Sequence, residues 1–301
     1  MLKSSSILFS DLRRVKILFT SDLHGEISLY DQLLAFIRIH SPEIILLGGD
    51  LLPSFPPTKR YEDLIPHQKS FMNHFLFPFF ERIKEITPIV RLFSIPGNWD
   101  LAYPDLFREP IEDWIDLSGK KYLFENGYEI IGYPFVPPTP FRPKNYEKRD
   151  DEQSPWPPQK IPSYLRISDR DDDLIPIDPY LFLNSQETIK GDLKKLPEPT
   201  SPHRTLYLTH SPPFGTCLDQ TRGGKFAGSR SIRAFIEKTQ PILTLHGHIH
   251  EAPEISGAYM EKIGKTIAIN PGQFTSSDLQ MVIFEIEDIE GTLSHNFFSK
   301  T

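Results

Sequence analysis

"RLFSIPGNWDLAYP" occupies residues 91–104 of the chain. An apolar run typical of a β-strand stops at a Pro-Gly turn, and the turn presents the amide of Asn98 and the carboxylate of Asp100 on either side of the indole of Trp99. In open α/β sheets the ligand crevice lies at the carboxyl ends of the strands. This segment therefore predicts a buried strand that leads directly into a binding site.

Short apolar runs of this kind recur along the 301 residues, with helix-like segments between them. This alternation is typical of strands joined by crossover helices, so we predict an α/β fold. Asn126-Gly127 predicts a tight hairpin between two further runs. We expect strands near residues 15–20, 43–48, 88–95, 204–209, 241–246, 265–270 and 279–287, and helices at 27–40 and about 66–86.

Residues 134–200 break the alternation. Nine prolines between positions 134 and 162 exclude regular helix and central strand there. A segment this long inside a compact domain is usually a functional lid or a linker. Its aromatic residues favour a segment packed onto the rest, and they include Phe135, Phe141, Tyr146 and Trp156. We expect one domain over residues 1–301 with a Pro-rich insertion at about 134–200.

The composition excludes several classes of function. The formal net charge is −7, which argues against a general binder of nucleic acid or anionic membranes, although a local cationic pocket stays open. The single cysteine, Cys217, excludes an internal disulfide and a multi-cysteine metal site. No apolar run approaches the roughly 20 residues that span a bilayer, and the short apolar run after Lys3 lacks the features of a secretory signal. We therefore expect a cytoplasmic protein.

Seven side chains of metal-ligating type follow five of the predicted strands. Each alone has an ordinary explanation as a turn residue, but their common position at strand ends predicts a shared site. His248 and His250 are separated by one residue and point the same way in an extended segment. The seven residues are Asp22, His24, Asp50, Asn98, His210, His248 and His250.

This inventory fits a pair of divalent ions. Two carboxylates, one amide oxygen and four imidazoles suffice for two borderline ions when one carboxylate bridges them, whereas a structural zinc site would use thiolates. Two such ions, two carboxylates and one hydroxide leave a net charge of about +1, which suits a phosphate ester.

The order of these motifs resembles the calcineurin-like metallophosphoesterase superfamily. The motifs are D-x-H (Asp22, His24), G-D (Gly49, Asp50), G-N-x-D (Gly97, Asn98, Asp100), His210 and G-H-x-H (Gly247 to His250). The segment from His210 to about residue 285 is similar to predicted phosphoesterases related to the Icc cyclic-nucleotide phosphodiesterases.

The resemblance implies a four-layer αββα sandwich of two mixed β-sheets flanked by helices, with a dimetal site at the carboxyl ends of the strands. One metal would be held by Asp22, His24, Asp50 and His250, and the other by Asp50, Asn98, His210 and His248. Asp50 would bridge the two ions, which would be Mn²⁺, Fe²⁺ or Zn²⁺.

Trp99 departs from the family pattern, in which G-N-H-D or G-N-H-E supplies a histidine that protonates the leaving group. An indole donates a hydrogen bond but has no accessible pKa, so Trp99 cannot replace that acid. Three alternatives stay open. In the first, the protein hydrolyses esters with good leaving groups or uses another proton donor, and Trp99 packs against a base or aryl ring of the substrate. In the second, the site binds metal and phosphate but turns over poorly; in the third, Trp99 only fills the core and unrelated groups catalyse the reaction. His246 is the nearest candidate donor, or else a buried strand histidine. Asp100 is either an orienting residue or a turn cap.

Further candidates for substrate binding lie outside the ligand set. Arg222 and Lys225 belong to a glycine-rich loop before a predicted helix whose N-terminus would hold a second phosphate or a nucleotide, unless Ser229 or Ser231 simply caps it. Tyr103, Phe141 and Trp156 are candidates for lining a substrate pocket.

We therefore expect a dimetal-dependent phosphoesterase that hydrolyses a phosphodiester or nucleotide-like phosphate ester by metal-activated hydroxide. Asp50, Asn98, His210 and His246 are the candidate catalytic residues, and Trp99, Arg222 and Lys225 the candidate substrate contacts. The expected partner is a small-molecule phosphate ester or nucleotide rather than a membrane or nucleic acid. The alternative is a catalytically weak metal-binding scaffold or partner-binding module with the same fold.

Overall fold

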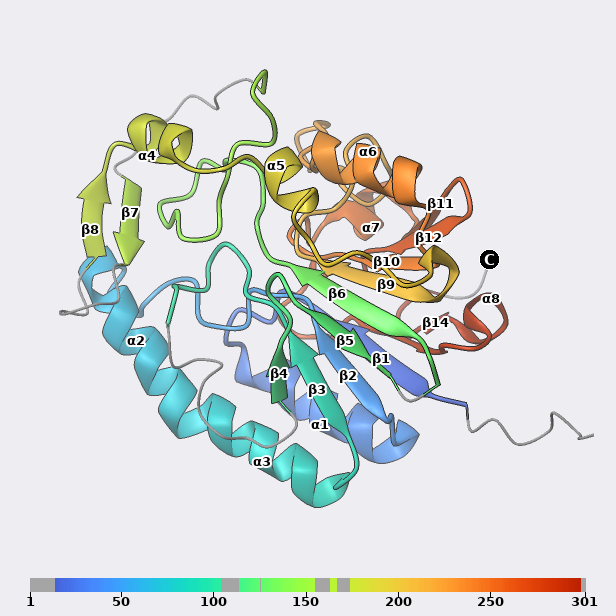
Figure 1. The fold of residues 1–301 in the computed structure, drawn as a ribbon. Helices are drawn as coiled ribbons and strands as arrows, with labels where there is room; N and C mark the ends of the chain where they lie inside the picture. The colour runs from blue at the N-terminus through green and yellow to red at the C-terminus, as the bar shows by residue number, and fades with distance from the viewer. Residues whose placement is uncertain (1–13, 104–113, 125, 155–162, 167–173, 299–301) are drawn as a thin grey trace, which may run out of the picture.

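The structure is a computed structural model, and it describes residues 14–103, 114–124, 126–154, 163–166 and 174–298. Two six-stranded sheets form its centre (Figure 1). The first sheet has the order β14-β13-β1-β2-β3-β4, in which β1 to β4 run parallel and β13 is antiparallel to β1 and β14. Its strands are β1 (Lys16–Thr20), β2 (Ile44–Leu47), β3 (Arg91–Ser94), β4 (Trp114–Asp116), β13 (Val282–Glu285) and β14 (Ser294–His295).

The second sheet has the order β11-β12-β10-β9-β6-β5. Its four central strands are parallel, and each edge strand pairs antiparallel with its neighbour. Its strands are β5 (Lys121–Leu123), β6 (Glu129–Tyr133), β9 (Thr205–Thr209), β10 (Leu243–Leu245), β11 (Met260–Ile263) and β12 (Thr266–Ile269). Both sheets are therefore mixed, as predicted.

Alternation along β1 explains how the layers stack. Ile17 and Phe19 belong to the cluster of buried residues between the two sheets, together with Leu206 of β9 and Leu245 of β10. Leu18 points the other way and packs with the helices that cover the first sheet. These helices are α1 (Ile27–His40), the 3₁₀ turn Tyr61–Asp63, α2 (Leu64–Phe71), the π-helical turn Met72–Leu76 and α3 (Phe77–Ile86).

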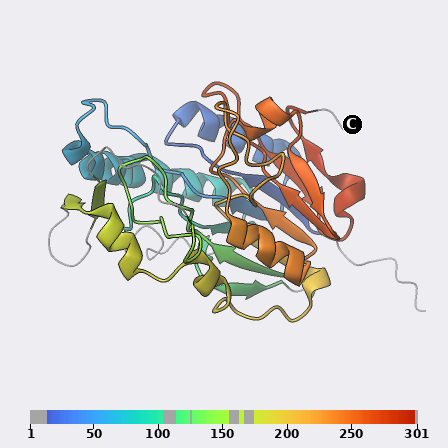
Figure 2. The same ribbon diagram turned by 90° about the horizontal axis from the view of Figure 1, so that it is seen from above.

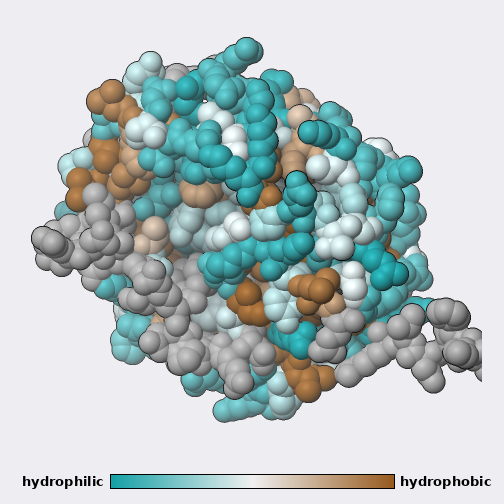
Figure 3. All heavy atoms as spheres, in the orientation of Figure 1, coloured by the Kyte–Doolittle hydropathy of each residue, from teal (hydrophilic) through white to brown (hydrophobic). Residues whose placement is uncertain are grey.

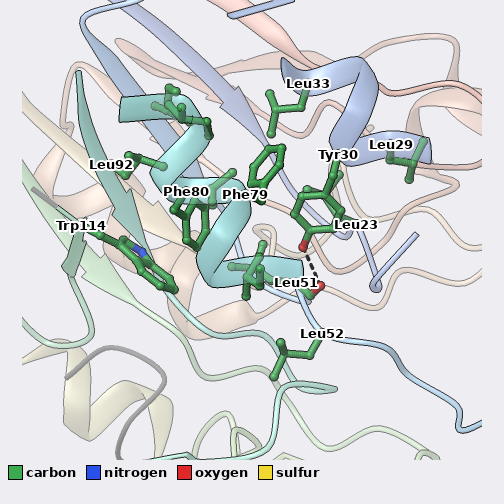
Figure 4. Packing of buried hydrophobic residues seen from close by; sticks show 14 of the residues in the cluster. Leu23, Leu29, Tyr30, Leu33, Leu51, Leu52, Phe79, Phe80, Leu92 and Trp114 are labelled. Carbon is green, nitrogen blue, oxygen red and sulfur yellow. Dashed lines mark hydrogen bonds between the residues drawn. The ribbon is translucent and has the colours of Figure 1, made fainter. Parts of the chain in front are cut away.

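Aromatic and aliphatic side chains fill the layer between the first sheet and its helices. Tyr30 of α1 meets Phe79 of α3 edge to face with ring centroids 5.0 Å apart, and its hydroxyl donates a 2.7 Å hydrogen bond to the carbonyl of Leu51 (Figure 4). Leu51 follows Asp50 directly in the chain. The helical layer thus supports the loop that carries a candidate ligand.

Helices on the outer face of the second sheet complete the fourth layer. In Figure 1, α6 lies above the pair of sheets and α1 below it, so α6 is nearest the viewer in the view from above (Figure 2). Ile232 and Ile236 of α6 pack with Ala268 of β12. The remaining helices are α4 (Pro179–Ser185), α5 (Ile189–Leu193), the 3₁₀ turn Pro202–Arg204, α6 (Arg230–Thr239), α7 (Ala252–Ser256) and α8 (Ile289–Thr292). The four-layer αββα sandwich is confirmed.

Hydrophilic residues cover most of the face drawn in Figure 3, with separate small apolar patches. Among the residues that the structure describes, none of the helices combines the length and the apolar character needed to cross a bilayer.

Several local expectations are confirmed, and others need correction. The helix at 27–40 has the predicted bounds, and the Asn126-Gly127 hairpin joins β5 to β6. β4, β11 and β14 were not predicted. The expectation of no regular helix across 134–200 is wrong for its later part, because α4 and α5 form there beyond the dense prolines, as does a separate pair of strands, β7 (Ser163–Arg166) and β8 (Leu174–Ile177). Trp156 lies outside the described residues.

Candidate metal centre

The loops after the parallel strands of both sheets meet at one edge. The N–H of Asp22 donates to the carbonyl of Gly49 (2.9 Å), and the N–H of His24 donates to the carbonyl of Asp50 (2.8 Å). In the second sheet the N–H of Gly247 donates to the carbonyl of His210 (3.0 Å). Backbone hydrogen bonds therefore fix the loops that carry the predicted ligands.

Four candidate ligands have a left-handed backbone, with φ of 60° at Asp22, 47° at His24, 52° at Asp50 and 68° at His248. Residues other than glycine rarely adopt this backbone conformation, and each residue held in it costs on the order of 1–3 kcal/mol. Such strain concentrates at functional sites because the surrounding structure must hold it. Gly97 packs so tightly against the Asp50 carboxylate that a Cβ there would collide with it.

Four side chains of this edge form one cluster. Ligand atoms of Asp22, His24, Asp50 and His250 all lie within 4.8 Å of one another. The Nε2 atoms of His24 and His250 face each other at 3.2 Å, and His250 Nε2 lies 3.7 Å from Asp22 Oδ1. Convergent imidazole and carboxylate groups are suited to hold a divalent metal ion.

A second group of donors adjoins the first at Asp50. Its Oδ2 lies 3.4 Å from His210 Nε2 and 3.8 Å from His24 Nε2. Among the described residues, Asp50 Oδ2, His210 Nε2 and both amide atoms of Asn98 are buried without a hydrogen-bond partner. His248 completes the group, with its ring centroid 5.3 Å from that of His210. Buried polar atoms without partners are costly, so this donor set fits metal ions as the missing partners.

Electrostatics within the site are strongly coupled. Burial opposes ionisation of Asp50, but His210 and His24 keep the pKa of Asp50 below its usual value. Burial lowers the pKa of His210, yet the Asp50 carboxylate outweighs it and raises that pKa to about 9. Burial and the neighbouring imidazole of His210 lower the pKa of His248 to about 3. A neutral imidazole is the form that binds a metal, so His248 is ready to do so, whereas metal binding at His210 would displace the proton that Asp50 stabilises.

Partners outside the ligand set orient two of the imidazoles. His210 Nδ1 lies 2.8 Å from the carbonyl of Gly48, and His24 Nδ1 lies 2.9 Å from Ser54 Oγ. Each contact directs Nε2 of the same ring toward the site. Sequence analysis did not identify Ser54, because this serine belongs to none of the ligand motifs.

Asp100 acts as a cap between two loops. Its buried carboxylate accepts hydrogen bonds from the N–H groups of Leu51 (3.2 Å), Leu52 (2.8 Å) and Gly97 (2.9 Å). It thereby ties the loop after β2 to the loop after β3. Of the two alternatives for Asp100, the structure supports the turn cap.

Two cavities flank the cluster. One has a volume of about 280 Å³ and is lined by Asp50, Asn98 and His248 among others. The other has a volume of about 350 Å³ and includes Asp22 and His24 in its lining. Trp99, Phe141 and His250 line both cavities.

Trp99 itself is only 5% exposed. Its ring centroid lies 4.8 Å from that of Phe55 and 5.1 Å from that of Phe141, and its backbone N–H donates a 2.7 Å hydrogen bond to Asp50 Oδ1. The insertion therefore reaches the candidate site through Phe141, as the sequence suggested. Tyr103 instead is buried in the core beneath the helices, with its hydroxyl 3.4 Å from the carbonyl of Ile65.

The role of His246 as a proton donor needs correction. Its ring is fully buried, with Nδ1 2.8 Å from Thr209 Oγ1 and 3.1 Å from the carbonyl of Ser211, and Nε2 2.8 Å from Thr244 Oγ1. Burial lowers the pKa of His246 to about 3. Both nitrogens are engaged within the sheet, so His246 is a structural histidine.

Arg222 and Lys225 are not brought into either cavity. Arg222 forms a 2.6 Å ion pair with Glu254, and the cavity lining from this loop consists of Thr221 and Ala227. Of the two alternatives for the helix N-terminus, the structure supports capping. Ser229 Oγ accepts the N–H of Ile232 (3.0 Å), and the carboxylate of Asp150 accepts the N–H of Arg230 (2.7 Å).

Fold and site together define an α/β protein with a candidate metal centre at the ends of its parallel strands. The calcineurin-like phosphoesterase family model matches residues 15–252, and the chain belongs to this family. No curated protein matches the sequence.

Two solved structures share the fold at low sequence identity, and a third is similar at a TM-score below 0.5. One crystal structure has a TM-score of 0.60 and 19% identity, with 95% of this chain and 100% of that chain covered. The protein TT1561 of Thermus thermophilus has a TM-score of 0.52 and 15% identity, with coverage of 94% and 98%. A dimetal phosphatase from Danio rerio has a TM-score of 0.49 and 9% identity, with coverage of 90% and 95%.

Proposed function

We propose that this protein hydrolyses phosphodiesters at a centre of two divalent ions. Asp22, His24, Asp50 and His250 hold one ion, and Asp50, Asn98, His210 and His248 hold the other. The observation that carries the proposal is the position of Asp50 Oδ2, which lies within 4 Å of an imidazole nitrogen from each group and has no hydrogen-bond partner among the described residues.

When bound, such a pair of ions supplies an activated water and neutralises charge on the phosphoryl group. The chain's own residues keep that chemistry in place. The carbonyl of Gly48 can only accept, so it keeps a proton on His210 Nδ1 and orients Nε2 toward the site. Ser54 Oγ positions the ring of His24 through Nδ1, and Asp100 fixes the loops of Asp50 and Asn98 relative to each other. The histidine of the family's usual motif is replaced by Trp99, so a leaving group that departs without protonation is favoured.

Preference for a diester rather than a monoester is supported by the two cavities. A diester carries two substituents on the phosphoryl group, and two separate cavities of about 280 and 350 Å³ adjoin the candidate ligands and share Trp99, Phe141 and His250 in their linings. A monoester would leave one of them without a substituent.

The test is hydrolysis of bis-p-nitrophenyl phosphate and p-nitrophenyl phosphate by the purified full-length protein with Mn²⁺, each with and without EDTA. We expect EDTA-sensitive turnover with a higher kcat/KM for the diester. Asp50→Ala abolishes it, whereas Asp31→Ala, an equal loss of charge on the exposed face of α1, leaves it unchanged.

The outcomes separate the alternatives. Stoichiometric metal binding that Asp50→Ala removes, without turnover of any ester, would favour the metal-binding scaffold. A higher kcat/KM for the monoester would contradict the diester assignment and retain the hydrolase.

A further inference from the structure

Two exposed phenylalanines, Phe55 and Phe141, line a cavity of the candidate site. Among the described residues, Phe55 is 59% exposed, Phe141 41%, Phe226 45% and Phe297 53%, and these are the phenylalanines classed as exposed. Phe55 and Phe141 line the cavity of about 350 Å³. Phe297 packs on Phe274, which lines the same cavity, with ring centroids 5.3 Å apart. Leaving large apolar rings in water is unfavourable, and their clustering beside a site indicates a ligand surface.

The rings of Phe55 and Phe141 both contact the ring of Trp99. Phe55 lies 4.8 Å from Trp99 at an interplanar angle of 56°, and Phe141 lies 5.1 Å away at 43°. Since Trp99 is almost fully covered, the two phenylalanines beside it supply the exposed ring surface at this point of the cavity lining. Asp22, His24 and His250 line the same cavity, so these surfaces adjoin the candidate metal centre.

Both rings are carried on fixed backbone. Lys144 is fully buried, and its Nζ donates to the carbonyls of Phe141 (2.6 Å) and Thr139 (2.9 Å) and to Glu147 (2.9 Å). Phe141 N–H donates to Thr139 Oγ1 at 3.1 Å. This buried network orders the segment before any ligand arrives, which lowers the entropic cost of binding.

Phe55 is held by its neighbours. Its ring meets Tyr61 edge to face at 6.3 Å, and the guanidinium of Arg142 covers Tyr61 at 4.3 Å from the ring centroid. Phe55 also follows Ser54, which is hydrogen-bonded to His24. The ring therefore has a defined position relative to the candidate ligands.

We infer that this cavity holds a planar aromatic substituent of the ester, such as a nucleobase or an aryl ring, with Phe55 and Phe141 as its stacking surfaces and Trp99 as their support. The inference rests on the proposed function for the position of the phosphoryl group. The inference explains why Phe55 and Phe141 are exposed yet held in place. A planar ligand that stacks on them would remove their apolar surface from water and so bind favourably.

The test compares ligands that differ only by a ring, measured by isothermal titration of the Mn²⁺-loaded full-length protein. AMP and ribose 5-phosphate share a phosphate and a sugar, and phenyl phosphate and methyl phosphate compare an aryl ring with a methyl group. We expect AMP to bind roughly tenfold more tightly than ribose 5-phosphate. A similar gain for phenyl over methyl phosphate assigns the cavity to any planar ring, and a gain confined to AMP assigns it to a nucleobase.

Variants locate the effect. Phe55→Leu and Phe141→Leu retain apolar area but lose the ring, and we expect each to reduce the gain for AMP about fivefold, while Phe55→Tyr and Phe141→Tyr retain it. Phe226→Leu is the matched control, since this exposed phenylalanine lines neither cavity.

Equal affinities for AMP and ribose 5-phosphate in the wild-type protein would overturn the inference, as would an equal loss in Phe226→Leu. Hydrolysis of bis-p-nitrophenyl phosphate without any preference for a ring would refute the aromatic subsite alone. A ring preference without metal-dependent hydrolysis would refute the proposed function alone.

Discussion

The carboxylate of Asp150 attaches the insertion to the N-terminus of α6. It accepts hydrogen bonds from the backbone N–H groups of Arg230 (2.7 Å) and Ser231 (3.3 Å) and from the hydroxyl of Ser229, and it is only 4% exposed. Ser229 Oγ in turn accepts the N–H of Ile232 at 3.0 Å. Unpaired N–H groups and the helix dipole both favour a negative charge at this point.

We predict that Asp150→Ala lowers the free energy of unfolding by about 3 kcal/mol. Loss of an N-terminal cap costs about 1 kcal/mol, and a hydrogen bond to a buried charged group contributes about 1.5–3 kcal/mol. Asp150→Asn retains one acceptor oxygen without the charge, so a loss of about 1–2 kcal/mol is expected. Turnover should persist in both variants, because Asp150 lines neither cavity of the site.

Urea denaturation followed by circular dichroism measures these losses. Asp178→Ala is the matched control, because Asp178 caps α4 through the N–H groups of Tyr180 (2.8 Å) and Leu181 (3.2 Å) but is exposed. Its loss should be about 1 kcal/mol or less and should shrink in roughly 0.5 M salt, whereas the loss for Asp150→Ala should not. If Asp150→Ala costs no more than Asp178→Ala, burial of the carboxylate does not strengthen this cap.

Three further predictions follow from the site and the C-terminal strand. Trp99→His should raise turnover of esters with poor leaving groups more than that of p-nitrophenyl esters, and an equal change in both would count against the general-acid argument. Mn²⁺ at about a thousandfold above its Kd should raise the unfolding free energy by about 4 kcal/mol in the wild-type protein and have no such effect in Asp50→Ala, as urea titrations would measure. Burial lowers the pKa of His295 to about 4 from its ordinary 6.5, so stability is present above pH 6.5 and is lost as the pH falls toward 4. Between about pH 7 and 5 the loss should be about 2 kcal/mol, and His295→Gln should lack it.

The sequence predicted many of the strands because strand identity is local information, whereas the four layers were expected only from the family resemblance. The buried runs around Ile17 and Ile45 are continuous and short, and the helix between them has its apolar residues at three- and four-residue spacing. Polar residues directly after such runs sit at one edge of a parallel sheet, so the meeting of Asp22 with Asp50 followed from topology. The left-handed backbone of these residues was not predicted, because it depends on the surrounding structure that holds it.

Contacts between distant segments were not predictable in the same way. Ser54, Gly48 and Asp100 orient ligands through hydrogen bonds whose partners depend on how loops from different strands approach each other. His246 shows the converse error. Alternation placed it on the same side as His248, but the sheet register gave both of its nitrogens buried partners.

The insertion was the hardest segment to interpret, since its prolines exclude regular structure without saying what replaces it. A fully buried Lys144–Glu147 pair at 2.9 Å is an unusual core for a loop, because desolvating both charges is costly unless hydrogen bonds satisfy them. Here those hydrogen bonds fix the backbone that carries Phe141 against Trp99. Trp99 and the insertion are therefore linked. The resemblance to the family places a proton-donating histidine at this position, whereas Trp99 supports Phe55 and Phe141, the rings that we infer hold a planar substituent. A substrate whose leaving group needs no proton but offers a flat face would satisfy both departures at once.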